Sequence, residues 1–435
     1  MHSVHPSRGS SWLLRAAVAV FCTSPFFALP SYAATDDLRA QIEMLRAEQA
    51  RIAELQRQTD EKLRALEGKL GVVASPATTP TTQPSAPAAT LGTAAAPRFN
   101  VSGDMRLRSQ GDYSDTNLPD RTSAQVRGRL GATYAVNDRV TIGARLVTGD
   151  PDDPNSTDVQ LANFDDDLQV SLDLAYAQLN FGDLKVFGGK IPQPFARTDL
   201  VWDSDVNPQG VSAVYKKLLA DGSALRASGL FFIVDEQAVA TDSTMAGAQV
   251  GYDSAALGDW KYDLSVAYYD YRLGNTSGGD AGDFRSNLRN PDGSYLSDFN
   301  LGDLVAGISW SGAGERWPLH ATADYVHNFG AETSADTGYG LDLALGRASK
   351  QGDWRLTYGY SVAETDSVLA AFSHDNIVIG TNYRLHALTF DYVPMPKTLL
   401  TAIWYHYQPY NPANVGANDS GDWLERLRLA FLVNF

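Results

Sequence analysis

The sequence predicts an all-β fold, a transmembrane antiparallel β-barrel of about sixteen strands preceded by a short α-helical coiled coil. Three observations lead to this prediction. Apolar and polar residues alternate with a period of two through much of residues 98–435. No apolar run in that region reaches the roughly 18 residues of a membrane-spanning helix. Short turns and long polar loops alternate along the chain, which is typical of barrels in outer membranes.

The composition agrees with a β fold and argues against one class of binding partner, nucleic acids. The 435 residues include 37 Gly, 20 Tyr and 8 Trp, and Lys+Arg total 35 against 51 Asp+Glu, a formal net charge of −16. Aromatic residues favour strands. A nucleic-acid partner needs a basic surface, so this charge balance argues against nucleic-acid binding.

Residues 1–34 have the layout of a cleaved secretory signal peptide. Arg8 and Arg15 precede an apolar stretch over residues 16–29, and small residues lie before Thr35. The stretch is shorter than the roughly 20 residues that span a membrane. The single cysteine, Cys22, lies inside this segment, so we expect the mature chain to contain no disulfide. Lipidation of Cys22 is the alternative, which the bulky preceding Phe21 disfavours.

Residues 35–70 carry apolar side chains at the three-four spacing of a coiled coil, which we expect to lie in the periplasm. A lone helix would expose this apolar stripe, so the segment favours self-association. Gln49 and Gln56 interrupt the core and are expected to help fix its register. The predicted core contains Leu38, Ile42, Leu45, Ile52, Leu63 and Leu66.

Residues 71–97 are rich in Ala, Thr, Pro and Ser, a composition that cannot bury enough apolar surface to fold. This predicts a flexible tether between the coiled coil and the barrel. The barrel itself is then expected over residues 98–435.

Segments of alternating residues recur through the expected barrel. They include residues 101–108, 126–134, 140–146, 170–176, 260–268, 319–325, 339–345, 354–362 and 427–435. Together with their links they give about sixteen strands, an even number that returns the C-terminus to the side of the short turns. The least distinct strands are those near Val211, Ile377 and Leu399.

Aromatic residues gather where the expected strands end. One set lies beside short links: Tyr134, Phe181, Trp260, Trp317, Trp354 and Phe435. A second set lies beside long links: Tyr325, Tyr360, Trp404 and Trp423. Two aromatic girdles are typical of a barrel that crosses a bilayer, one girdle at each interface.

Two stretches resemble known outer-membrane proteins. The last strand, with Phe431, Val433 and a terminal Phe435, resembles the signal read by the barrel-assembly machinery of Gram-negative bacteria. Residues 173–176, 189–195 and 198–205 resemble the Putative porin family, with a more distant similarity to phosphate-selective porins. The resemblance implies a signal, coiled coil, tether and barrel in the outer membrane, a trimeric homo-oligomer, and contact with lipid and lipopolysaccharide. It also implies passage of small hydrophilic solutes.

If apolar side chains face the lipid, the alternate positions face the lumen. On the first three strands and the last strand, which closure brings together, these positions hold basic residues. They are Arg106, Arg108, Arg127, Arg129, Arg145, Arg426 and Arg428. We expect them to form a basic wall of the pore. The alternative is that carboxylates such as Asp104 and Glu425 neutralise them.

The third long loop, residues 191–210, is the expected constriction. In porins this loop commonly folds into the lumen, and the resemblance implies the same here. Its acids opposite the basic wall would produce a transverse field; the alternative is that they remain on the outer surface. The constriction residues are Phe195, Asp199, Trp202, Asp203 and Asp205.

No metal site, cofactor or catalytic residue is predicted. The second loop is rich in acids between residues 150 and 167, but their spacing matches no EF-hand. The seven His form no zinc or phosphate-loop motif, and no nucleophile elbow exists, so the chain is not expected to be an enzyme. The predicted function is passive diffusion of hydrophilic solutes and ions. The alternatives are an anion- or phosphate-selective channel and a structural tether between outer membrane and cell wall whose barrel is closed.

Overall fold

The computed structural model describes Arg57 and residues 98–114, 120–153, 155–162, 167–275, 279, 281–414 and 422–435. Two compact units divide the chain, Met1–Gly92 and Thr93–Phe435. In the first unit only Arg57 is described, in a helical conformation. The predicted signal peptide, coiled-coil core and tether therefore lie outside the described residues and stay predictions.

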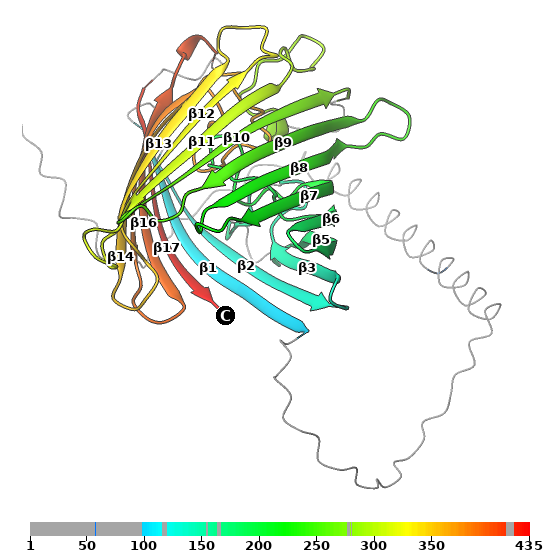
Figure 1. Cartoon of the computed structure of the whole chain (residues 1–435). Coiled ribbons are helices and arrows are strands. Elements are labelled where there is room, and N and C mark those ends of the chain that lie inside the picture. The colour runs from blue at the N-terminus through cyan, green and yellow to red at the C-terminus, as the bar shows by residue number, and fades with distance from the viewer. Residues whose placement is uncertain are drawn as a thin grey trace, which may run out of the picture. The chain divides into compact units, whose positions relative to one another are not determined.

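The second unit is a closed antiparallel barrel (Figure 1). Of the seventeen described strands, β4 is only two residues long, and the other sixteen close the sheet through the pairing of β1 with β17. The predicted fold class and strand number are thus confirmed. The strands are β1 Phe99–Ser114, β2 Arg121–Ala135, β3 Val140–Thr148, β4 Val159–Gln160, β5 Val170–Phe181, β6 Leu184–Lys190, β7 Gln209–Leu218, β8 Ala224–Asp235, β9 Ser243–Asp253, β10 Trp260–Leu273, β11 Asn300–Trp310, β12 Leu319–Asn328, β13 Thr337–Gly346, β14 Trp354–Ala363, β15 Tyr383–Tyr392, β16 Thr398–Pro409 and β17 Leu424–Asn434.

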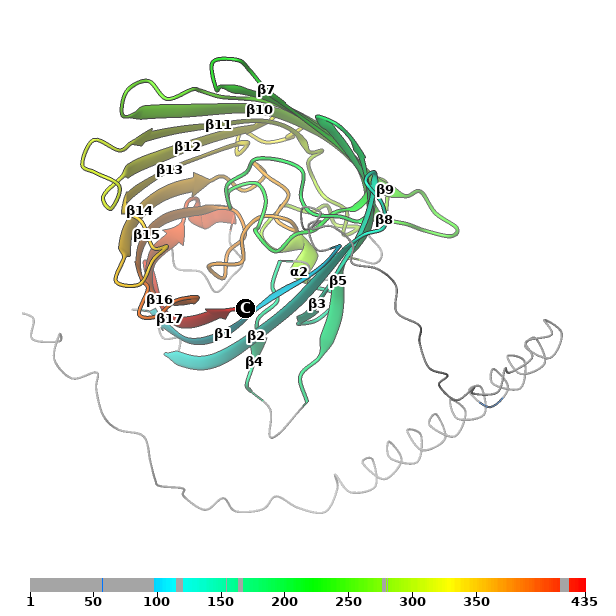
Figure 2. The ribbon, with the colours of Figure 1, turned by 60° about the horizontal axis from the view of Figure 1, so that its bottom comes forward.

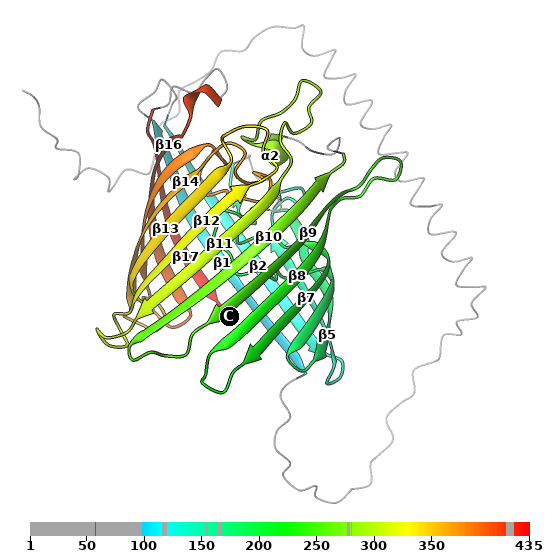
Figure 3. The ribbon, with the colours of Figure 1, turned by 45° about the horizontal axis from the view of Figure 1, so that its top comes forward.

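Closure depends on the two ends of the barrel segment. The register of β1 on β17 runs from Asp104 opposite Asn434 to Ser114 opposite Leu424. The C-terminal residue extends this ladder, because the Phe435 amide donates to the Gly103 carbonyl at 3.0 Å. Closure removes the free edges of the sheet, as a bilayer requires. Figure 3 shows the strands inclined to the barrel axis.

Alternation along the strands separates an apolar outer face from a polar inner face. In β1 the side chains of Met105 and Leu107 are 49% and 48% exposed. Asp104, which precedes Met105 on the same strand and faces the interior, is 8% exposed. Exposed apolar and buried charged side chains reverse the pattern of a soluble protein, and lipid as the outer solvent explains this reversal. Among the described residues no helix is long and apolar enough to cross a membrane.

Short turns join the strands at one end and long loops at the other. The two-residue turn between β5 and β6 uses Gly182 at a φ of +66°, a conformation that glycine adopts without strain. The long loops used below are the second loop (residues 149–169, which contains β4), the third loop (191–208), the fifth loop (274–299, with α2 Ala281–Phe284) and the seventh loop (364–382). The last loop contains the 3₁₀ turn η1 Pro412–Asn414.

Two of the three least distinct strands exist, since β7 contains Val211 and β16 contains Leu399. The third prediction, a strand near Ile377, is wrong. Ile377 lies in the seventh loop and is 1% exposed, because this loop turns into the barrel and is buried there. The hydrophobic pattern of an apolar loop segment that packs against other loops resembles that of a strand.

Aromatic side chains cluster at both ends of the wall. Near the short turns the rings of Trp317 and Trp354 lie 4.6 Å apart, and those of Trp260 and Trp310 lie 6.1 Å apart. At the long-loop end the Trp423 ring stacks on His406, which belongs to β16, at 4.0 Å. This distribution agrees with the two predicted girdles.

Candidate functional site in the barrel interior

The seven predicted arginines lie on the inner face of β1, β2, β3 and β17, and we refer to them as the arginine wall. Arg127, Arg426 and Arg428 are each less than 6% exposed. Strand pairing brings the members together, since Arg106 lies opposite Arg127 and Gln110 lies opposite Arg428. Residues more than 300 positions apart in sequence therefore share one surface.

Most arginines of this wall form ion pairs with aspartate carboxylates. Asp104 on β1 accepts a hydrogen bond from the Arg127 Nη2 at 2.8 Å and one from the Arg129 Nε at 2.7 Å. Arg426 on β17 donates to Asp112 at 2.5 Å. Arg428 instead contacts the neutral Gln110 at 2.8 Å. Asp104 therefore pairs with arginines of the wall, as the alternative interpretation of the sequence proposed, and two arginines share its carboxylate.

Glu425 does not take part in this wall. Its Oε1 lies 2.7 Å from the His406 Nδ1, and its Oε2 accepts a hydrogen bond from the Trp404 indole. Trp404 is 43% exposed, so this group lies on the outer face of the barrel. Glu425 follows Leu424 and precedes Arg426, and a strand turns adjacent residues to opposite faces.

The second loop and β5 supply two further carboxylates to the arginine wall. Asp158 lies 2.5 Å from Arg108 and accepts a hydrogen bond from the Arg106 Nε at 3.1 Å. Burial raises the pKa of Asp158, but Arg108 and Arg106 more than offset this, and the pKa lies below its usual range. Asp173 sits at a bulge between β3 and β5 and accepts from the Arg145 Nε at 3.0 Å. Neither contact could be read from the alternation pattern.

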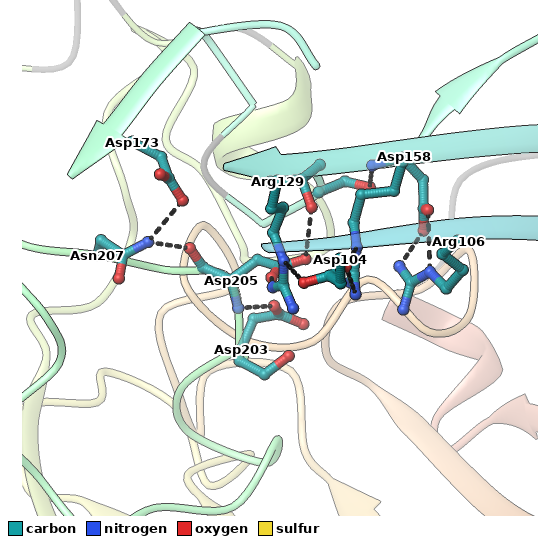
Figure 4. A network of polar contacts seen from close by, with 12 residues as sticks. Asp104, Arg106, Arg129, Asp158, Asp173, Asp203, Asp205 and Asn207 are labelled. Atoms are coloured by element: carbon teal, nitrogen blue, oxygen red, sulfur yellow. Dashed lines mark hydrogen bonds and ion pairs between the residues drawn. The ribbon is translucent and has the colours of Figure 1, made fainter. Parts of the chain in front are cut away.

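The third loop folds into the barrel, and its five predicted residues separate into three environments. Phe195 and Trp202 are buried in an apolar cluster in which Trp202 lies edge-on to Tyr269 at 5.6 Å. Asp205 joins the arginine wall through Arg129 at 3.2 Å. Figure 4 shows Arg129 between Asp104 and Asp205, with Arg106 beside Asp158.

Asp199 and Asp203 contact the seventh loop. Asp199 accepts a hydrogen bond from the Asn376 amide at 3.0 Å, and the Asp203 carboxylate accepts from the Asp205 backbone amide at 2.7 Å. Burial raises the pKa of Asp203 above the usual range of aspartate, and the negative charges of Asp199 and Asp375 raise it further; the pKa of Asp199, whose side chain is exposed to the lumen, is raised because the surrounding barrel and loops limit its solvation. The predicted constriction residues therefore do not act as one group of equivalent acids.

The seventh loop also folds inward, which the sequence analysis missed. The Asp203 amide donates to the Phe372 carbonyl at 2.8 Å, and the His374 amide donates to the Asp199 carbonyl at 3.2 Å. The Phe372 ring stacks on Trp202 at 5.8 Å. The two inward loops thus support one another inside the barrel (Figure 2). An apolar run in a long loop, such as Val368 to Phe372, is the feature of the sequence that could have indicated a buried loop.

A third group of side chains lies on the inner face of β11, β12 and β13, and we call it the carboxylate wall. It consists of Asp303, Asp324 and Asp342. Asp303 and Asp324 are 3% and 5% exposed and accept hydrogen bonds from Tyr269 and Thr198. None of the three forms an ion pair with Lys or Arg among the described residues. The carboxyl groups of this wall therefore lack the cationic partners that those of the arginine wall have.

The predicted assembly residues lie on β17 and just after it. Phe431 pairs with Leu107 and Val433 with Met105, both of which are exposed on the outer face. Phe435 is 57% exposed. Within the part of the chain that the structure describes, no group of three or more His, Cys, Asp or Glu could hold a metal ion.

A closed antiparallel barrel with a lipid-facing apolar exterior and a charged interior defines the class of outer-membrane porins. Residues 113–282 match the model of a family described as Putative porin. The predicted resemblance to this family is confirmed over those residues, which include the motif at 189–205. The family match and the antiparallel barrel agree with one another over those residues.

One solved porin shares the fold at low sequence identity, and two others align with lower scores. OprB of Pseudomonas putida, at high pH, aligns with a TM-score of 0.54 and 11% identity over 78% of this chain and 94% of that one. An anion-selective porin from Comamonas acidovorans aligns with a TM-score of 0.47 and 12% identity, over 78% and 99%. The trimeric OmpT of Vibrio cholerae gives 0.46 and 13%, over 78% and 100%. No curated protein sequence matches the chain.

Proposed function

We propose that the chain is a passive-diffusion porin through which small hydrophilic solutes and ions cross the outer membrane. The observation that carries this proposal is the polar, charged inner face of a barrel of porin size. Such a face is hydrated rather than lipid-exposed, and charges inside a membrane protein line a pathway by default.

The proposed pore prefers cations. On the arginine wall, the five carboxylates of Asp104, Asp112, Asp158, Asp173 and Asp205 lie within ion-pair distance of an arginine. On the carboxylate wall, the acids have no cationic partner among the described side chains. Mobile cations are therefore attracted to the open carboxylates more strongly than anions are attracted to the neutralised arginines.

A second candidate function is a structural tether whose barrel is closed. The observation that favours it is the amount of loop inside the barrel, since Trp202, Val368 and Ile377 of two different loops are each less than 2% exposed. Water, not protein, fills the lumen of an open porin.

One experiment separates the two candidates. Purified protein inserted in a planar lipid bilayer, with a potassium chloride gradient, is expected to give ohmic current steps and a reversal potential of the sign for cation preference. Well-folded protein that carries no current would exclude the diffusion porin and favour the closed tether. A reversal potential of the opposite sign would favour the anion-selective channel.

The assembly we propose is a trimer with a periplasmic coiled coil over residues 35–70. The apolar repeat of Leu38, Ile42 and Leu45 supports self-association. The outer wall offers a second support, because small side chains at Ser109, Ala124 and Ala402 open an apolar groove across β16, β17, β1 and β2. The proposed partners include lipid, lipopolysaccharide and, through Phe431, Val433 and Phe435, the barrel-assembly machinery.

A further inference from the structure

A cavity of about 190 Å³ lies between the carboxylate wall and the two inward loops. Asp324 and Asp342 come from β12 and β13, Asp199 from the third loop, and His374 and Asn376 from the seventh loop. Among the described residues no Lys or Arg lines it. The cavity therefore has the electrostatic character of a site for a positive group.

The His374 ring is an unsatisfied polar group beside this cavity. The residue is 2% exposed, and neither ring nitrogen has a hydrogen-bond partner. Burial, with smaller contributions from the positive charges of Arg285, Arg428 and Arg426, lowers the pKa of His374 to about 3, so the ring is neutral and one nitrogen carries a free lone pair. A buried polar group without a partner costs free energy, and a donor in the cavity would relieve that cost.

The carboxylates are held so that acceptor atoms remain available. Thr198 donates to one oxygen of Asp324, whereas the other oxygen, Oδ1, has no amide, hydroxyl or cationic donor, and Asp324 lies beside the Asp303 carboxyl. Asp342 has space only because its neighbour on β14 is Gly359: a Cβ there would lie 2.4 Å from the Asp342 Oδ1. The site thus presents several carboxylate oxygens beside hydroxyl groups, such as those of Thr322 and Tyr383, that can both donate and accept.

We propose that this cavity binds the ammonium group of small organic cations, with Asp199, Asp324, Asp342 and His374 as acceptors. The inference rests on the proposed function, since it names a solute class for the same interior. A primary ammonium supplies three N–H donors to these carboxylate and imidazole acceptors, and the hydroxyl groups of the lining can accept as well. A metal ion fits less well, because no described group of these residues has metal-binding geometry.

The test compares two monovalent cations in the planar bilayer. Propylammonium carries three N–H donors, whereas tetramethylammonium carries the same charge and none. Propylammonium is expected to reduce the single-channel current saturably, and tetramethylammonium at equal concentration is not. Equal reduction by both would overturn the proposal, and so would a calcium block at lower concentration that Asp342→Asn removes.

Two variants test whether propylammonium blocks the current by binding in this cavity. Asp342→Asn, at an exposed position of the inner face, is expected to raise the half-blocking concentration of propylammonium about tenfold, the loss of one charge-assisted contact. Asp263→Asn is the matched control, because it removes an inward carboxylate on β10 that does not line the cavity. An equal change in the two variants would contradict a local site.

Failure of the proposed function is distinguishable from failure of this inference. If wild-type protein carries no current, calorimetric titration of propylammonium into the detergent-solubilised protein tests the site directly. Binding that Asp342→Asn weakens and Asp263→Asn preserves would support it. No binding to the wild-type protein would overturn it.

Discussion

The arginine wall and the carboxylate wall face each other within one barrel, yet their charges behave differently. Arg127 and Arg129 share Asp104, and Arg106 and Arg108 share Asp158. The carboxylates of β11, β12 and β13 have hydroxyl donors or no donor at all. The wall with more formal charges is therefore closer to neutral, and the number of charged residues on a surface does not give the field that a solute meets.

The difference has a topological origin. The arginine wall lies where the second and third loops fold back, and these loops carry Asp158 and Asp205 to it. The carboxylate wall receives Thr198 of the third loop and His374 of the seventh loop near the cavity, neither of which supplies a cation. Loop composition thus decides which wall keeps a net charge.

The largest change is expected from reversing two charges on the arginine wall. Arg127→Glu with Arg129→Glu would leave Asp104 beside two further carboxylates, so we expect a pronounced shift of the reversal potential towards cations and a less stable barrel. The measurement is the reversal potential in a salt gradient, with Lys217→Glu at an exposed strand end as the control. An unchanged potential would mean that these side chains lie outside the conducting path.

Removing the support between the walls should have the next largest effect. Trp202→Ala deletes the ring that packs on Tyr269 and Phe372, and a buried tryptophan lost in this way costs about 3–5 kcal/mol. We expect a lower free energy of unfolding and a larger, noisier single-channel conductance, because both inward loops depend on this contact. A conductance identical to that of the wild type would show that the loops do not limit the current.

Neutralising the shared carboxylate should shift selectivity in the opposite direction. Asp104→Asn leaves Arg127 and Arg129 without their common anion, so the reversal potential should move towards anions. The lost charge-assisted bonds should cost about 1–3 kcal/mol of unfolding free energy. Asp263→Asn removes the same charge from β10, where no arginine is released, and should shift the potential less.

The smallest effect is expected from pH. The limited solvation inside the barrel raises the pKa of Asp199, while Asn376 and Arg197 lower it and Asp375 and Asp342 raise it. A raised pKa means that Asp199 is neutral below that value and negative above it. Cation preference should therefore increase with pH, with a midpoint above the value of about 3.9 for a free aspartate. Asp199→Asn should remove this component of the pH titration.

The sequence predicted the wall of the barrel better than its interior. Period-two alternation identified the strands and the inward direction of Arg106 and Arg127, because a strand fixes which face each residue occupies. It could not pair Arg106 with Asp158, which comes from a loop with no period. It also mistook the segment at Ile377 for a strand, since burial under another loop selects apolar residues as a sheet does.

The ion preference of the wild-type channel tests the central claim most directly. A planar bilayer with purified protein and a potassium chloride gradient at neutral pH should give a reversal potential of the sign for cation preference, because most arginines of the arginine wall are ion-paired with carboxylates, whereas the acids of the carboxylate wall have no cationic partner among the described residues. A reversal potential of the sign for anion preference would contradict this account and would mean that the arginines, despite their ion pairs, control the pore.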